Sequence, residues 1–138
     1  MGVIASSDHY STHISYAMVY AGGKNRQAVF DGILKRRTYG ATDNILLEFW
    51  LGTHFMGDDF TSSNPGKIRV KVRGTGVIDA IHLIRDQAYI HKFQPGTRDA
   101  DVDFLDYGAG PGHHWYYVRV EQQDGQLAWS SPIWVRDR

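Results

Sequence analysis

Residues 67 to 73 alternate between cations and apolar residues, which places a strong constraint on the fold. The apolar residues are Ile68, Val70 and Val72, and the cations around them are Lys67, Arg69, Lys71 and Arg73. Successive side chains of a β-strand point to opposite faces of its sheet. The alternation therefore predicts a strand whose apolar face lies on a core and whose cations face solvent.

The rest of the chain from Asn44 to Val135 predicts further short strands. They cover residues 45–51, 77–84, 87–93, 101–105, 115–121 and 127–135. Asp124-Gly125 between the last two is typical of a tight hairpin, and Pro132 indicates an edge strand or a bulge. Short strands separated by turn residues indicate a two-sheet β-sandwich of immunoglobulin type.

One helix is predicted over residues 25 to 37. Asn25 is a favourable N-cap, and the apolar residues Val29, Phe30, Ile33 and Leu34 recur at helical spacing. Shortly before this helix there are five apolar residues that fit neither a strand nor a helix: Ile14, Tyr16, Met18, Val19 and Tyr20. We therefore expect three parts: an N-terminal segment of residues 1–24, a helix and connector over residues 25–43, and a β-sandwich domain over residues 44–138.

The charge balance and the cysteine count of the chain indicate which classes of binding partner and metal site to expect. Lys plus Arg and Asp plus Glu number 15 each, so the formal net charge is zero. This balance gives no electrostatic reason to expect nucleic acid or an acidic membrane as a partner. The chain has no cysteine, which excludes disulfides and thiolate metal sites and leaves the cellular compartment open.

Asp8, His9 and His13 are the candidate metal ligands. They follow the apolar run Val3-Ile4-Ala5, and in a barrel such strand ends carry the chemistry. Asp and His bind Zn, Mn or Fe, but the same residues also suit a polar loop with a capping Asp. No barrel can be built from what precedes them, so we expect the chain to begin inside a larger protein.

The other polar candidates favour structural interpretations. His113 and His114 precede the predicted strand that begins at Trp115. Adjacent strand residues point to opposite faces, so the two would not readily chelate one ion together, and a solvated loop is the favoured interpretation. We expect His54, His82 and His91 to be structural or exposed. Asp58-Asp59 lacks the regular oxygen spacing of a calcium loop and predicts an acidic turn.

Aromatic residues gather in the last two predicted strands. They are Trp115, Tyr116, Tyr117, Trp129 and Trp134. Such residues could form a sugar-binding platform, but on a hairpin they are more often core residues and cross-strand pairs.

Several stretches resemble the C-terminal part of a bacterial family of unknown function. Its members carry a metal-dependent hydrolase barrel of the polymerase-and-histidinol-phosphatase (PHP) type. The matching stretches are Ile4-Ala5-Ser6-Ser7-Asp8-His9, Thr12-His13-Ile14-Ser15-Tyr16-Ala17, and Arg36 to Asn44, followed by Met56-Gly57, Ile84-Arg85-Asp86, Tyr116 to Gln122 and Trp129 to Pro132. The resemblance runs along nearly the whole chain.

The resemblance implies metal ligation by the N-terminal segment. Asp8 matches the Asp of the superfamily's Ser-Asp-x-His motif, whereas His9 follows it directly, without the usual intervening residue. His9 is the first choice as the second ligand, and His13 remains an alternative. The full-length parent would bind divalent Zn, Mn or Fe, and this chain alone would bind none tightly.

Two function hypotheses follow. In the first, the chain is the non-catalytic C-terminal piece of a PHP-type metallohydrolase, and its sandwich supports or shapes the missing N-terminal barrel of the same polypeptide. The apolar N-terminal residues would then be available for self-association. In the second, the sandwich is a binding module for carbohydrate or a protein partner, and residues 1 to 43 are a leader.

Overall fold

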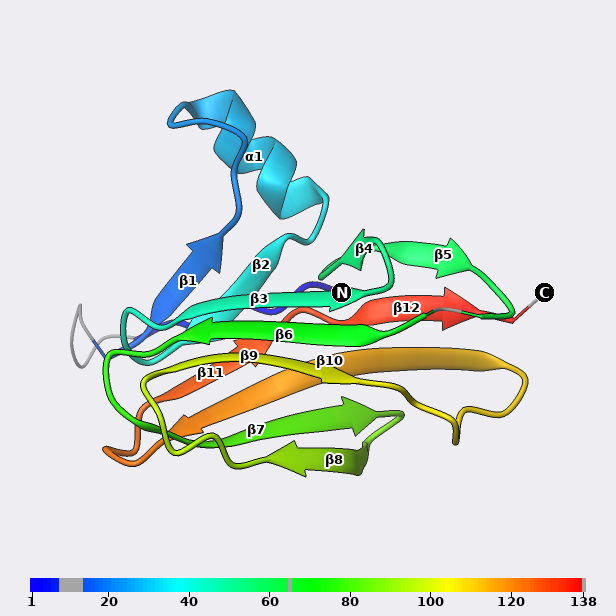
Figure 1. The fold of residues 1–138 in the computed structure, drawn as a ribbon. Coiled ribbons are helices and arrows are strands. Elements are labelled where there is room, and N and C mark those ends of the chain that lie inside the picture. The colour runs from blue at the N-terminus through cyan, green and yellow to red at the C-terminus, as the bar shows by residue number, and fades with distance from the viewer. Residues whose placement is uncertain (8–13, 65, 138) are drawn as a thin grey trace.

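The protein is a two-sheet β-sandwich with a short helix, as Figure 1 shows. The computed structural model describes residues 1–7, 14–64 and 66–137. The two sheets face each other across an apolar core. Phe49 and Val70 from one sheet, and Ile81, Val118 and Ile133 from the other, are fully buried in that core. The mainly β sandwich predicted from the sequence is confirmed.

The smaller sheet, sheet B, contains the alternating strand. Its order is β4 (His54–Phe55), β3 (Leu46–Leu51), β6 (Ile68–Arg73) and β9 (Asp99–Phe104), with antiparallel neighbours. Ile68, Val70 and Val72 are at most 1% exposed, as the alternation predicted. On the outer face, Arg69 and Lys71 stand opposite acidic residues of β9, so this face is a ladder of opposite charges.

The larger sheet, sheet A, is centred on β10. Its strands are β1 (Tyr16–Val19), β2 (Thr38–Ala41), β5 (Asp59–Thr61), β7 (Ile78–Arg85), β8 (Ala88–Phe93), β10 (His113–Gln122), β11 (Leu127–Ser130) and β12 (Ile133–Arg136). Strand β10 pairs with β7 on one side and with β11 and then β12 on the other. Pro132 lies at the break between β11 and β12. Because β12 lies between β10 and β5, the predicted edge strand at Pro132 is not observed.

Strands β1 and β2 were not predicted. They pair with each other, and β2 also pairs with β11. Gly40 of β2 allows the N-terminal segment to cross the sheet closely, because a Cβ there would lie 2.9 Å from Cβ of Ala5. Strand β1 lies in the predicted N-terminal segment and β2 in the predicted helix and connector, so sheet A contains strands from all three predicted parts. The division of the chain into domains at those boundaries remains a prediction.

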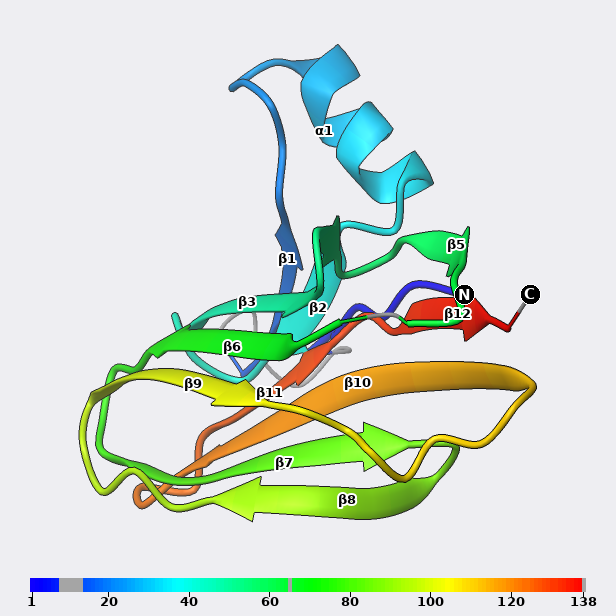
Figure 2. The same ribbon diagram turned by 45° about the vertical axis from the view of Figure 1, so that its right-hand side comes forward.

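Helix α1 (Arg26–Leu34) is shorter than predicted. The Asn25 side chain caps it by accepting the Ala28 N–H at 2.9 Å, and the helix ends where Arg36 adopts a left-handed conformation with φ of 57°. Its buried residue is Gly32, where a Cβ would come within 2.7 Å of the Tyr20 carbonyl oxygen. Figure 2 shows that the rest of α1 stands away from both sheets.

Candidate functional site

The three predicted metal ligands cannot be placed. Asp8, His9 and His13 lie outside the described residues. Within residues 1–7, 14–64 and 66–137, no group of three or more His, Asp or Glu side chains is arranged to hold a metal ion.

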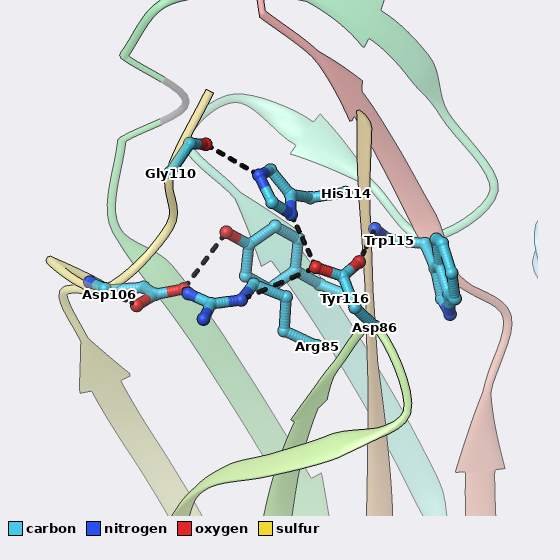
Figure 3. Close-up of polar contacts among 8 residues, drawn as sticks. Arg85, Asp86, Asp106, Gly110, His114, Trp115 and Tyr116 are labelled. Atoms are coloured by element: carbon cyan, nitrogen blue, oxygen red, sulfur yellow. Dashed lines mark hydrogen bonds and ion pairs between the residues drawn. The ribbon is translucent and has the colours of Figure 1, made fainter. Parts of the chain in front are cut away.

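A polar cluster lies instead at one end of the sandwich, where the β7–β8 turn meets the start of β10 (Figure 3). Its members are Arg85, Asp86, Asp106, His114 and Tyr116. They come from the end of β7, the turn that follows it, the segment after β9, and β10. We call this set the His114 cluster.

The β7–β8 turn positions Asp86. Asp86 and Gln87 both have positive φ, of 51° and 72°, which is the geometry of a tight two-residue hairpin. The Asp86 N–H donates to the Trp115 carbonyl at 3.1 Å, and the Trp115 N–H donates to Oδ1 of Asp86 at 3.0 Å. Backbone pairing therefore fixes the carboxylate beside His114.

Both ring nitrogens of His114 face acceptor oxygens. Nδ1 lies 2.5 Å from Oδ2 of Asp86, and Nε2 lies 2.7 Å from the Gly110 carbonyl oxygen. Two acceptors are satisfied only when both nitrogens carry hydrogen, so the site favours the imidazolium form. The hydrogen bond to Asp86 raises the pKa of His114, and the Gly110 carbonyl raises it further against the opposing effect of burial.

Asp106 connects Arg85 and Tyr116 within the cluster. Its Oδ2 pairs with the Arg85 guanidinium and accepts the Tyr116 hydroxyl at 3.1 Å, and its Oδ1 accepts the Gly108 N–H at 2.9 Å. Burial alone would raise the pKa of Asp106, but the hydrogen bonds from Gly108, Arg85 and Tyr116 outweigh it and lower the pKa. Burial also raises the pKa of Tyr116, which keeps its hydroxyl a donor.

The cluster holds a loop in place beside a small pocket of about 220 Å³. The pocket is lined by Ser62, Ser63, residues 109–112, His114, Tyr116, Val135 and Asp137. Nε2 of His114 is engaged by the Gly110 carbonyl, so this arrangement leaves no free imidazole nitrogen to act as a base on a substrate. The geometry supports a structural role, namely fixing residues 106–110 to the β7–β8 turn.

The solvated-loop interpretation of His114 is therefore wrong. His114 is the second residue of β10 and its side chain is only 17% exposed, because Asp86 and Gly110 enclose it. His113 is exposed, so the two neighbours do point to opposite faces. Asp86 could have been suspected from the sequence, since Arg85-Asp86 separates the predicted strands 77–84 and 87–93, and a two-residue turn puts its side chains at the end of the sheet.

The remaining polar candidates have structural partners. His54 stacks on Phe60 with ring centroids 3.6 Å apart, and His91 stacks on Phe104 at 4.5 Å. Nε2 of His82 lies 3.4 Å from Oε1 of Glu121. Asp58 accepts the Phe55 N–H at 3.0 Å between β4 and β5, whereas Asp59 begins β5, so the predicted acidic turn includes Asp58 but not Asp59.

The aromatic residues of the last strands divide between two faces. Tyr116 is 2% exposed and belongs to the core. Trp115, Tyr117, Trp129 and Trp134 occupy alternate positions that point away from the core, and each is half-buried. Trp115 stands directly opposite Trp134 across β10 and β12, a cross-strand pair of the kind predicted.

Helix α1 carries an uncovered apolar face. Phe30, Ile33 and Leu34 are 53%, 50% and 61% exposed, and Val29 is 40% exposed. The helical spacing predicted from the sequence is correct, but these residues do not pack on the sandwich. Among the described residues, no helix is long and apolar enough to cross a membrane.

The chain is similar to uncharacterized proteins of Chlamydia. It is 31% identical to one from Chlamydia pneumoniae and 28% identical to one from Chlamydia trachomatis serovar D, and each match covers 80% of this chain. The match covers 21% of each relative, so the chain spans about a fifth of the length of the curated relatives it matches. No family model and no solved structure matches it.

Proposed function

We propose that this chain is a non-catalytic β-sandwich domain that docks, through helix α1, onto the hydrolase barrel of a larger PHP-type protein. The observation that supports this proposal is the exposed apolar face formed by Val29, Phe30, Ile33 and Leu34. The barrel is the occupant implied by the sequence resemblance. The greater length of the Chlamydia relatives is consistent with a second domain beside the sandwich.

A helix of this kind requires a packing partner. Isolated helices shorter than about 12 residues are marginal in water, and most of their stability in proteins comes from packing an apolar face. Helix α1 has nine residues and buries only Gly32. Covering four large apolar side chains would supply the stabilisation that the sandwich does not.

The chemistry of the proposed hydrolase belongs to the barrel. Divalent ions there would activate water and polarise the scissile group. This chain would contribute Asp8 with His9 or His13 as ligands, and the described residues contain no group of three or more His, Asp or Glu side chains arranged to hold a metal ion by themselves. The sandwich would support the barrel and shape its rim.

Limited proteolysis of a longer polypeptide, in which the proposed barrel precedes this chain, tests the proposal. Docking should protect the Ala21-Gly22-Gly23 stretch before α1 from cleavage. Phe30→Glu should speed that cleavage, because a carboxylate cannot be buried against an apolar partner without large cost. Lys35→Gln is the matched control, since it changes the charge by the same amount, and Lys35 is exposed at the C-cap of the same helix on the side away from the apolar face.

Two results would contradict the proposal. One is equal cleavage of the Phe30→Glu and Lys35→Gln proteins. The other is a gene whose reading frame encodes no barrel before this chain, which would remove the proposed partner.

A further inference from the structure

We infer that the outer face of sheet B carries a binding site for an acidic saccharide, in the groove beside Trp50. The groove is lined by Trp50, Gly52, Thr53, Lys67, Arg69 and Lys71 and has a volume of about 460 Å³. Small-molecule sites typically measure about 300–1,000 Å³ and combine aromatic walls with a few polar groups. The site lies on sheet B and is independent of the proposed docking through α1.

Trp50 supplies a fixed aromatic wall. It belongs to β3, points away from the core and is half-buried. The Phe55 ring lies 5.2 Å away on one side, and the Lys71 ammonium lies 5.7 Å from the ring centroid. An amphipathic, pre-positioned ring of this kind offers apolar surface at little entropic cost to the C–H face of a sugar ring.

The charges on this face are not evenly distributed. Lys71 lies opposite Glu48 of β3 and Asp101 of β9, so that row carries more acid than base. Arg69, by contrast, lies opposite Trp50 on one side and Asp103 on the other. Its row has no second carboxylate.

Positive charge is therefore in excess at the Trp50 end of the groove. Lys67 and Arg69 share the single carboxylate of Asp103, at 2.7 and 3.2 Å. The two cations line the groove, and Asp103 does not. A second carboxylate, carried by a ligand, would complete the pairing that Asp103 begins.

The backbone of Gly52, one of the lining residues, lies close to that of Gly66. Gly52 and Gly66 have φ of 60° and 90°, and a Cβ on Gly66 would lie 3.2 Å from Cα of Gly52. The chain therefore crosses itself there without side chains. The exposed Thr53 hydroxyl can exchange hydrogen bonds with ring hydroxyls, whereas the Gly52 N–H already donates to the Lys67 carbonyl at 2.9 Å. A ring wall, excess cations and neutral polar groups together match a sugar that bears a carboxylate, such as a uronic acid.

Titration of the ¹⁵N-labelled chain with glucuronate, followed by NMR, tests the site. We expect glucuronate to shift the Trp50 indole N–H and the Gly52 and Thr53 amides at millimolar concentration. Glucose, which is the neutral counterpart of glucuronate, should bind more weakly by a factor of up to about five, the difference expected for one exposed ion pair. Adenosine monophosphate tests the alternative that any ring with an anionic group suffices.

Paired variants locate the binding. Arg69→Gln should weaken glucuronate binding, whereas Arg73→Gln, at the far end of the same strand and outside the groove, should not. Trp50→Leu should abolish the shifts, and Trp129→Leu on sheet A should preserve them. Circular dichroism would establish that each variant is folded. Equal binding of glucose and glucuronate, tighter binding of adenosine monophosphate, or equal effects of the paired variants would overturn the inference.

Discussion

Asp86 and His114 are 28 positions apart in the chain, yet the Asp86 carboxylate lies 2.5 Å from Nδ1 of His114. This contact joins the β7–β8 turn to the start of β10. Because Nε2 of the same ring bonds to Gly110, one imidazolium fastens two loops to the end of the sandwich. The stability of that end should depend on the protonation of His114.

Raising the pH should weaken the His114 cluster. The Asp86 hydrogen bond raises the pKa of His114 above its unfolded value. The stabilisation is then fully present below the unfolded pKa of about 6.5 and is lost as pH rises through the folded pKa. The difference in melting temperature between the unaltered protein and His114→Gln should shrink with increasing pH.

His113→Gln is the control for that experiment, because His113 is exposed on the opposite face of β10. Its melting temperature should follow that of the unaltered protein at every pH. A His114→Gln difference that grows with pH would show that the neutral ring is the stabilising form. Asp106 acts in the opposite sense, since its lowered pKa adds stability that is lost only in acid.

Truncation of the core should separate the two faces of β3. Phe49 is fully buried, and Phe49→Ala should lower the free energy of unfolding by about 3–5 kcal/mol. Leu46 on the same strand is 52% exposed, and Leu46→Ala should change it by about 0.5 kcal/mol or less. Urea denaturation measures both, and similar losses would mean that the register of β3 is wrong.

Gly57 should tolerate no side chain. Its φ is 95°, and a Cβ there would lie 2.4 Å from the Arg36 carbonyl oxygen. Gly57→Ala combines this clash with backbone strain and should cost more than about 1 kcal/mol. Gly125→Ala, at a φ of 85° with no atom within 4 Å of the new Cβ, should show the strain alone. Equal losses of unfolding free energy would rule out the close contact between Gly57 and Arg36.

The chain alone should bind divalent ions weakly. Asp8 with His9 or His13 provides too few ligands without the surrounding residues that orient each His. Calorimetric titration with manganese or zinc should give no tight, stoichiometric step. Tight binding that Asp8→Ala abolishes would show that the chain builds its own metal site, contrary to the proposed division of roles.

Sequence patterns predicted the strands that have one apolar face. The alternation over Ile68, Val70 and Val72 leaves one way to bury them, so β6 was predicted correctly. Strands β1 and β2 were missed because they are short and lack such alternation; all of β2, from Thr38 to Ala41, is buried. The pairing of β2 depends on a distant partner, β11, and β1 in turn pairs with β2, so the local sequence pattern cannot show either strand.

The candidate site was less predictable than the fold. Spacing placed Phe30 and Leu34 on one helix face, but periodicity cannot show whether anything covers that face. In the same way, His114 carries no local sign of Asp86, because the two meet only through the pairing of β7 with β10. Whether the apolar face of α1 is covered, and whether His114 meets Asp86, both depend on contacts between residues that are far apart in the sequence.

Hydrogen exchange of α1 tests the central claim most directly. In this chain alone, the amides of residues 26–34 should exchange much faster than those of β3 and β6, because the helix lacks packing. In the longer polypeptide, in which the proposed barrel precedes this chain, docking should slow hydrogen exchange in α1. The Phe30→Glu substitution should make exchange in α1 fast again. An α1 that exchanges equally fast in the long and short proteins would contradict docking of this helix onto a neighbouring domain.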